Sequence, residues 1–486
     1  MCQDIIEQGK MSPGNKESDG VKIQTFSSFL HLTFSARFLH PIQELTFADD
    51  LQKMRFSSFR GLPHIVNMEG IRQGNPKSLT RGLMIALLAT TMVVVYFTSG
   101  PGAPHLYLEQ LPLSCLPSSA ISEQDNQTNS SQSTTCSPKF DVMFMKTHKT
   151  ASSTLLNILF RFGEKHRLKF AFPDGRNDFY YPSPFHRSQV RNYRPGACFN
   201  IICNHMRFDG REVSRLLPSD SAYITILRDP ARLFESSFHY YRSMIPLTWR
   251  IPGPHKLAEF LSSPRTYYKP DGYNSFYLKN LLFFDFGFDN NLEADDPSVE
   301  TGVRALAERF DLVLIAEHFE ESLVLLRDAL CWTTDDLLFF SLNARRTASV
   351  SRLSPEQRAK ARDWNGVDWR LYRHFNGTLW AKVEAYGRAR MERDVKELRK
   401  RNAEMRGICL VGGGAVEAGM IRDKDMLPWQ PVGETSILGY NLRNDIDPQH
   451  RTLCRKMLTP EIQYLSNLGV NLWLTQLWGW LKDLLC

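Results

Sequence analysis

A short segment rich in lysine and hydroxyl residues has the composition of an anion-binding loop. It reads KTHKTASST and stands between an apolar run and a stretch with helical spacing. Backbone N–H groups at a helix N-terminus bind anions, and hydroxyl side chains add further donors. Its residues are Lys146, Thr147, His148, Lys149, Thr150, Ala151, Ser152, Ser153 and Thr154.

Lys149 has the chemistry to stabilise the charge that develops on the bridging oxygen of a leaving phosphate. The loop occupies the position of a phosphate-binding loop but lacks the glycines of GxxxxGK[ST]. An ordinary Ser/Thr helix cap beside a solvated lysine is therefore the alternative interpretation.

A second element supplies an arginine and a serine at phosphate-binding positions. Arg228 ends a predicted strand, in Leu227-Arg228-Asp229-Pro230, and Ser236 follows on the next predicted helix. Arginine suits phosphate because its planar guanidinium makes paired hydrogen bonds. The two elements together predict a clamp for two phosphates.

A histidine is predicted to act as a general base. His205 follows an apolar run, and its unperturbed pKa of ~6.5 suits proton transfer near neutral pH. His148 is the rival, although we expect it to shape the loop. A structural histidine that caps the strand is the alternative for His205.

Alternating strands and helices are expected to position these residues. Apolar runs at 140–145, 199–203, 222–227 and 312–316 predict buried strands. Helical spacing marks 154–162, 231–241 and 319–330, and a highly charged stretch at 384–405 predicts a long solvated helix. This order indicates an α/β fold with a mostly parallel central sheet flanked by helices, in which sites form at the carboxyl ends of the strands.

Composition narrows the class of ligand. The 486 residues are 42% hydrophobic and 23% charged, as in globular proteins, and the net charge of +7 is too modest for a nucleic-acid binder. It suits a nucleotide or an anionic membrane surface. Nine cysteines are present, and in an oxidising compartment some would pair, with a connectivity that cannot be read from spacing.

The N-terminal third predicts a membrane anchor. Residues 82–99 are uncharged and just long enough to span a bilayer, and the basic residues before them place the N-terminus in the cytoplasm. Residues 1–81 are then a cytoplasmic tail, with an alternative start at Met68. Residues 100–138 form a flexible stem, and 139–486 a lumenal domain with a helical C-terminal part. Sequons at Asn126, Asn129 and Asn376 would carry N-glycans on the lumenal side.

The phosphate motifs together resemble those of Golgi sulfotransferases, and longer segments resemble the galactose 3-O-sulfotransferase family. The segments are KTHKTASSTLLNILFRFGEKHRLKFAFP, RPGACFNIICNHMRF, ILRDPARLFESSFHYY, ESLVLLRDALCW and TPEIQYL. The resemblance implies a P-loop-like sulfotransferase fold whose first loop binds the 5′-phosphosulfate of 3′-phosphoadenosine 5′-phosphosulfate, with Arg228 and Ser236 on the 3′-phosphate. No metal would be required.

The resemblance further implies a type II protein of the Golgi membrane that sulfates the 3-hydroxyl of a terminal β-galactose. We expect a galactose-terminated glycolipid, galactosylceramide, as the acceptor, with glycoprotein glycans as the alternative. A homodimer is one assembly that the resemblance allows.

Two interpretations from other classes of protein function stay open. A Golgi glycosyltransferase would share the membrane layout, and Asp423-Lys424-Asp425 and Asp445-Ile446-Asp447 match its DxD metal motif. A membrane-tethered, non-catalytic lectin-like module would bind no donor at all.

Three further segments have less specific patterns. The loop from Asn343 to Arg352 either closes over the donor or forms a solvated basic turn. Asp285-Phe286-Gly287 lacks a kinase catalytic loop, so we interpret it as structural. Residues 469–486 have a helical apolar stripe, which predicts core packing, with a membrane-interfacial helix as the minority hypothesis.

Overall fold

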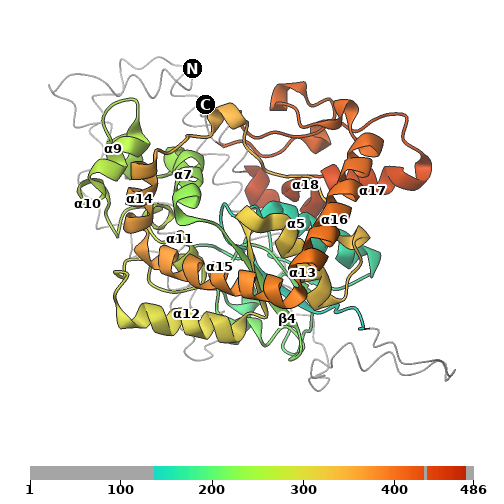
Figure 1. Ribbon diagram of the computed structural model, residues 1–486, viewed down its shortest axis with the longest axis horizontal. Coiled ribbons are helices and arrows are strands. Elements are labelled where there is room, and N and C mark those ends of the chain that lie inside the picture. Colours follow the sequence, from blue (N-terminus) through green and yellow to red (C-terminus); the bar gives the residue numbers. More distant parts are fainter. Residues whose placement is uncertain (1–135, 432–434, 478–486) are drawn as a thin grey trace, which may run out of the picture. The chain divides into compact units, whose positions relative to one another are not determined.

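A parallel β-sheet lies at the centre of the computed structural model, which describes residues 136–431 and 435–477 (Figure 1). The strand order is β2-β3-β1-β4-β5, and every neighbouring pair is parallel. The strands are β1 (Val142–Met145), β2 (Phe170–Ala171), β3 (Ile201–Ile202), β4 (Ala222–Leu227) and β5 (Leu312–Ile315). The predicted α/β class and parallel sheet are therefore confirmed.

The four predicted strands are present, and β2 is an addition. Its two residues are too few to give a periodic signal, and its pairing with β3 defines it. The strands are almost wholly buried and apolar, as expected when helices cover both faces of a parallel sheet.

The position of β1 determines where the site forms. It pairs with β3 on one side and with β4 on the other, with Val142 opposite both Ile201 and Ala222. After β1 the chain forms β2 and then β3 on one side of β1. It then crosses to the other side and forms β4, so the strand order reverses at β1. Ligand sites of open α/β sheets form at such a switch point, beyond the carboxyl ends of the strands.

Three predicted helices are found close to their expected bounds. They are α5 (Ser152–Lys165), α7 (Pro230–Tyr241) and α13 (Phe319–Leu330). The side chain of Asp229 accepts hydrogen bonds from the N–H groups of Ala231 and Arg232, and Pro230 occupies the first turn, so α7 begins directly after β4.

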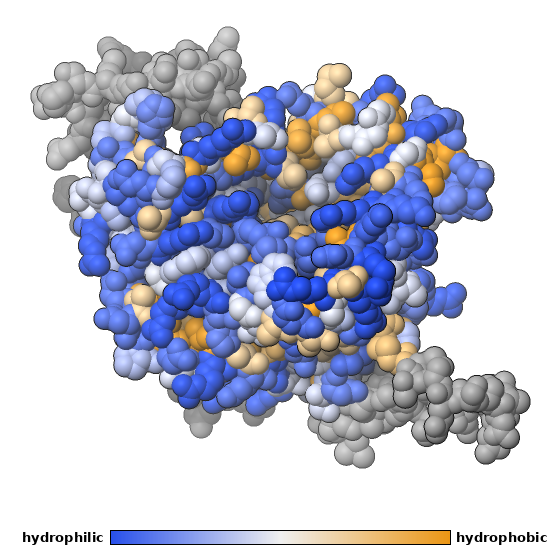
Figure 2. Space-filling view, in the orientation of Figure 1, coloured by the Kyte–Doolittle hydropathy of each residue, from blue (hydrophilic) through white to orange (hydrophobic). Residues whose placement is uncertain are grey.

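The predicted start of the long helix at 384–405 is wrong. Two helices, α15 (Gly366–Tyr386) and α16 (Arg388–Cys409), meet at Gly387, whose φ of 92° lies outside the helical region. Most residues of α16 are exposed, and Figure 2 shows mainly hydrophilic residues over it, so its solvated character is confirmed.

The remaining helices cover the sheet and extend the fold at two ends. In Figure 1, α9, α10 and α14 lie beside α7, whereas α17 and α18 lie near α5 and α16. Their bounds are α6 (Gly210–Val213), α8 (Pro246–Trp249), α9 (Lys256–Ser262), α10 (Pro264–Tyr267), α11 (Leu281–Asp285), α12 (Pro297–Arg309), α14 (Pro355–Trp364), α17 (Pro448–Leu458) and α18 (Glu461–Asn467).

Disulfides fasten two places in the fold. Cys136 pairs with Cys331, directly after α13, and Cys409 pairs with Cys454, which joins the end of α16 to α17. Beside the first disulfide, Lys139 donates its N–H to Leu330 O, and the Trp332 indole donates to Lys139 O. The expectation that some cysteines pair is confirmed.

Several predictions concern residues outside the described part. These are the tail at 1–81, the membrane segment at 82–99, most of the stem, Asn126, Asn129 and the end of the chain from 478. Among residues 136–431 and 435–477, no helix has the length and apolar character needed to cross a membrane. Asn376 lies within α15 and is half-buried.

Candidate functional site

The loop between β1 and α5 has a strained backbone that leads into an uncapped helix. Lys149 and Ala151 both have positive φ, at 60° and 65°. Ala151 precedes α5, and its methyl group cannot accept a hydrogen bond from the first turn. The helix therefore presents N–H groups that no N-cap side chain occupies, which suits an anion.

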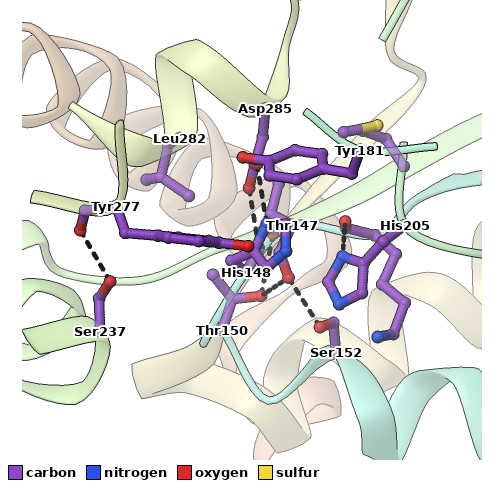
Figure 3. Close-up of polar contacts among 12 residues, drawn as sticks. Thr147, His148, Thr150, Ser152, Tyr181, His205, Ser237, Tyr277, Leu282 and Asp285 are labelled. Carbon is purple, nitrogen blue, oxygen red and sulfur yellow. Dashed lines mark hydrogen bonds and ion pairs between the residues drawn. The ribbon is translucent and has the colours of Figure 1, made fainter. Parts of the chain in front are cut away.

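The hydroxyl groups of the loop hold its shape. Thr147 Oγ1 donates to the Ile226 carbonyl on β4, and Ser152 Oγ donates to the Thr147 carbonyl at 2.8 Å. Thr150 Oγ1 lies 2.9 Å from Thr147 Oγ1 (Figure 3). Because these hydroxyls already bond within the protein, the backbone N–H groups and the lysines are the groups left to bind an anion.

The two later hydroxyls of the loop contact distant segments. Ser153 Oγ donates to Glu461 Oε2 at 3.3 Å, and Thr154 Oγ1 accepts from the N–H of Leu342 at 3.0 Å. The start of α5 is thus attached to the C-terminal α18 and to the segment after α13.

The two lysines of the loop have different surroundings. Lys146 is 2% exposed, and its Nζ lies 3.1 Å from Glu461 Oε2. The Nζ of Lys149 instead lies 3.4 Å from the centre of the Tyr240 ring. Burial, together with the positive charges of Arg345, Arg228 and Lys146, lowers the pKa of Lys149 well below its ordinary value. A site with this excess of positive charge favours an anionic ligand.

The two predicted phosphate motifs meet in space. Arg228 Nη1 donates to the carbonyl oxygen of Lys149 at 2.9 Å, and burial lowers the pKa of Arg228 from its ordinary value. Ser236 is buried on the following helix, α7. The contact places the guanidinium of the second motif against the backbone of the first.

A further arginine joins this cationic cluster from a segment distant in sequence. Arg345 forms a buried ion pair with Glu235 of α7, whose other oxygen accepts the N–H of Ser351 at 2.9 Å. The alternative of a solvated basic turn is wrong for Arg345, whose side chain is 7% exposed. It holds for Arg346, which is about half exposed and pairs with Glu417.

The two candidate histidines stack on each other. The ring centres of His148 and His205 are 4.0 Å apart, with an interplanar angle of 9°. His205 Nδ1 lies 2.9 Å from the Lys146 carbonyl, and His148 Nδ1 lies 2.9 Å from Asp285 Oδ1 (Figure 3). Both partners are acceptors, so each ring donates from Nδ1, and the neutral form of the His205 ring has its lone pair on Nε2.

The environment keeps the His205 imidazole neutral. Burial lowers its pKa well below the ordinary value, and the positive charges of His148 and Lys146 act in the same direction. A neutral imidazole with an unprotonated Nε2 can accept a proton from a hydroxyl group.

Two carboxylates of the site were not predicted from the sequence. Glu461 lies in TPEIQYL, near the end of the chain, and Asp285 lies in the Asp-Phe-Gly segment that we interpreted as structural. Both contact the β1–α5 loop. In the sequence, each of them is only a carboxylate in an otherwise apolar segment. Such a pattern does not indicate that the residue contacts the β1–α5 loop, which is distant in sequence.

The aspartates of the DxD-like motifs are engaged elsewhere. Asp423 and Asp425 lie 3.4 and 3.5 Å from the guanidinium of Arg455. Asp445 pairs with Arg443, whose hydrogen bonds lower the pKa of that carboxyl to about 2. Asp447 caps α17. Ion pairing and capping thus account for all four side chains.

Comparison with known proteins identifies relatives over most of the chain. The family described as galactose-3-O-sulfotransferase matches residues 65–472. Galactosylceramide sulfotransferase of Mus musculus is 55% identical over 417 residues, which cover 84% of this chain and 97% of the relative. The Homo sapiens protein of that name is 54% identical over 413 residues, with the same coverage.

A relative with a different name matches a shorter part. Galactose-3-O-sulfotransferase 2 of Homo sapiens is 46% identical over 335 residues, which cover 68% of this chain and 83% of the relative. The loop between β1 and α5, the arginine beside it and this breadth of similarity lead to one assignment. The chain belongs to the galactose-3-O-sulfotransferase family.

Proposed function

We propose that this protein transfers a sulfuryl group from 3′-phosphoadenosine 5′-phosphosulfate to the 3-hydroxyl of a terminal β-galactose, with galactosylceramide as the acceptor. The observation that carries the proposal is the contact of Arg228 with the backbone of Lys149, which joins the two phosphate motifs. Relatives named galactosylceramide sulfotransferase, at 53–55% identity over 84% of the chain, favour the glycolipid over a glycoprotein glycan.

Lys146 to Thr154 would surround the 5′-phosphosulfate, and Arg228 and Ser236 would bind the 3′-phosphate. Lys149 is better suited than Lys146 to the leaving phosphate, because Lys146 already pairs with Glu461. Its ammonium group would stabilise the charge that appears on the bridging oxygen as the bond to sulfur breaks.

The transfer step follows from the tautomer of His205. The galactose O3 forms a bond to sulfur, the bond between sulfur and the phosphate oxygen breaks, and the electron pair leaves with 3′-phosphoadenosine 5′-phosphate. The hydroxyl proton moves to His205 Nε2, the nitrogen left free by the bond from Nδ1 to the Lys146 carbonyl. The donor supplies the sulfuryl group, and positioning and charge stabilisation lower the barrier.

We retain the predicted location in the Golgi membrane as part of the proposal. The charge bias around residues 82–99 supports a type II anchor in the Golgi membrane with a lumenal catalytic domain. The disulfides Cys136–Cys331 and Cys409–Cys454 support an oxidising compartment.

Calorimetric titration with 3′-phosphoadenosine 5′-phosphate tests the donor assignment. We expect binding by the full-length protein in detergent and a loss of about tenfold to a hundredfold in affinity for Arg228→Ala, since a hydrogen bond to a charged group contributes ~1.5–3 kcal/mol. Arg399→Ala is a matched control, because Arg399 is an exposed residue of α16 that pairs with Glu320 of α13. Absence of binding by the unmodified protein would refute the proposal.

Acceptor assays distinguish the two substrate classes. Purified protein is supplied with donor and either galactosylceramide in mixed micelles or a galactose-terminated glycoprotein. We expect the higher kcat/KM for the glycolipid. A higher value for the glycoprotein would keep the sulfotransferase reaction and overturn the choice of acceptor.

A further inference from the structure

Three large hydrophobic side chains are exposed on two separate segments of the chain. Met244, in the turn between α7 and α8, is 46% exposed, and Trp249, at the end of α8, is 53% exposed. Tyr273, on the loop after α10, is 63% exposed. The Trp249 indole donates to the Arg242 carbonyl at 2.9 Å, so its ring lies beside the turn that carries Met244.

Contacts between the two segments join these side chains into one surface. Asn274, the neighbour of Tyr273 in the chain, donates its side-chain amide to the Met244 carbonyl at 2.9 Å. On the other side of Tyr273, the Leu247 side chain packs so closely on Gly272 that a Cβ there would lie 2.8 Å from it. Single exposed apolar side chains are ordinary, whereas a group of them on one surface is typical of an interaction site.

The same two segments carry aromatic residues of the site. Helix α7 ends with Tyr240 and Tyr241, and the Lys149 ammonium lies over the Tyr240 ring. Tyr241 stacks on Tyr277 with ring centres 3.8 Å apart, and the Tyr277 ring lies edge-on to His148 at 5.6 Å (Figure 3). The exposed apolar surface is therefore continuous in the chain with the aromatic side of the site.

This surface is basic as well as apolar. Residues 242–256 include Arg242, Arg250 and Lys256 but no aspartate or glutamate. Arg250 is exposed directly after Trp249, whose carbonyl accepts a hydrogen bond from the Lys256 ammonium at 3.1 Å. Tryptophan and tyrosine favour the boundary between membrane and water, and neighbouring lysine and arginine side chains are attracted to anionic lipid headgroups.

We propose that this docking surface holds the catalytic site against the lipid bilayer that contains the acceptor. Its residues are Met244, Leu247, Trp249 and Tyr273, together with Arg242 and Arg250. The inference rests on the proposed function and deepens it. Galactosylceramide has a single sugar between its reacting hydroxyl and the lipid, so the site must come close to the bilayer for that hydroxyl to reach His205.

Docking acts on access to the acceptor and leaves the chemistry of transfer unchanged. Insertion of Met244 and Trp249 into the headgroup region removes apolar surface from water, which stabilises the docked state. The arginines add an attraction to anionic lipids that weakens as salt is raised. Both effects raise the concentration of membrane-held acceptor at the site, so they lower its apparent KM and leave kcat unaltered.

The test compares one pair of substitutions on three acceptors. Full-length protein is reconstituted in vesicles of phosphatidylcholine and phosphatidylserine, and the acceptor is galactosylceramide in the same vesicles, soluble methyl β-galactoside or a galactose-terminated glycoprotein. For Met244→Ser/Trp249→Ser we expect kcat/KM for galactosylceramide to fall about tenfold through a higher KM, since contact of two large side chains with lipid is lost. The values for the two soluble acceptors should not change.

Met420→Ser/Trp429→Ser is the matched control. It removes the same two side-chain types from the segment between α16 and α17, where Met420 is 69% and Trp429 is 38% exposed. We expect no change with any acceptor, and an equal loss in both pairs would overturn the inference. An equal loss for galactosylceramide and methyl β-galactoside would also overturn it, as would a loss confined to the glycoprotein, which would assign the surface to a polypeptide.

Methionine oxidation is a second measurement that needs neither a variant nor turnover. Hydrogen peroxide converts exposed methionine to its sulfoxide, and mass spectrometry follows Met244 and Met420 in the unmodified protein. We expect oxidation of Met244, relative to Met420, to be several-fold slower in vesicles than in detergent. An unchanged ratio would overturn the docking surface, whereas absence of transfer to methyl β-galactoside by the unmodified protein would count against the proposed function instead.

Discussion

The ammonium group of Lys149 faces the ring of Tyr240, with Nζ 3.4 Å from the ring centre, whereas Lys146 in the same loop pairs with Glu461. An aromatic face attracts a cation without neutralising it. Lys149 is thus held in the site with its charge available to an anion, and three other cations lie near enough to lower its pKa.

Replacement of Lys149 by alanine is expected to affect turnover more than donor affinity. Loss of one group that stabilises transition-state charge costs about 10²–10³ in kcat. Several other groups share the binding of the donor, so its affinity should fall less. Steady-state kinetics and calorimetry measure the two effects.

Lys169→Ala is the control, because Lys169 also lies over an aromatic ring, that of Phe199, outside the loop between β1 and α5. Its kcat should match that of the unmodified protein. A larger loss of donor affinity than of turnover in Lys149→Ala would assign that lysine to ground-state binding.

Replacement of His205 by alanine is expected to abolish transfer and leave donor binding intact. The His205 side chain supplies the unprotonated Nε2 but contributes no charge to the donor site, since its pKa is lowered well below the ordinary value. Retained turnover would remove His205 from the mechanism.

The same lowered pKa sets the pH dependence of the unmodified protein. The base is active when neutral, so activity is lost as pH falls through its pKa. The acidic limb of kcat/KM for the donor should therefore lie below the ordinary histidine value of about 6.5. The acidic limb of kcat should lie at higher pH than that of kcat/KM, because the bound phosphates favour the charged imidazole of His205. A limb in kcat/KM above pH 7 would contradict this assignment.

Replacement of Arg345 by methionine is expected to destabilise the fold as well as the donor site. It would leave Glu235, which is 3% exposed, as a buried carboxylate without its arginine partner, at a cost of about 3–5 kcal/mol. Denaturant unfolding measures the loss. The double variant Arg345→Met/Glu235→Gln should recover part of the stability without recovering donor affinity, and full recovery of both would exclude Arg345 from donor binding.

Removal of the Cys409–Cys454 disulfide is expected to lower stability without affecting the site directly. It closes a loop of 45 residues and joins α16 to α17. In the chain-entropy model such a loop contributes about 4 kcal/mol. The paired Cys409→Ser/Cys454→Ser variant should melt at lower temperature, with an unchanged KM for the donor at low temperature. An unchanged melting temperature would contradict this prediction.

Sulfuryl transfer is expected to persist in the presence of a metal chelator. Lys149, Arg228 and Arg345 supply positive charge where a metal ion would otherwise neutralise phosphates. Activity is compared before and after dialysis against EDTA. Loss of activity that added divalent metal restores would favour a metal-dependent transferase, such as a glycosyltransferase.

The sequence predicted the elements that have local signals. Strand β4 and helix α13 were found at their predicted residues, because each is a continuous apolar run or a clear helical stripe. The break at Gly387 was missed, since charged residues on both sides suit an exposed helix equally well. Strand β2 was missed because tertiary pairing, rather than its own two residues, defines it.

The sequence predicted the candidate site residues that directly follow neighbouring strands of the sheet. Lys149, His205 and Arg228 follow β1, β3 and β4, which are neighbours in the sheet, so their contacts follow from parallel pairing. Glu461 and Asp285 come from segments whose path over this edge is set by packing. Nothing in their local sequence indicates that path.

The disulfide between Cys136 and Cys331 also has a mechanical consequence. Force applied to the chain ahead of Cys136 passes through a covalent bond into the end of α13 before it can reach β1. The bonds between Lys139 and both Leu330 and Trp332 share that load. Strand β1 is thereby shielded from tension, so a tether could pull on this domain without distorting the loop between β1 and α5.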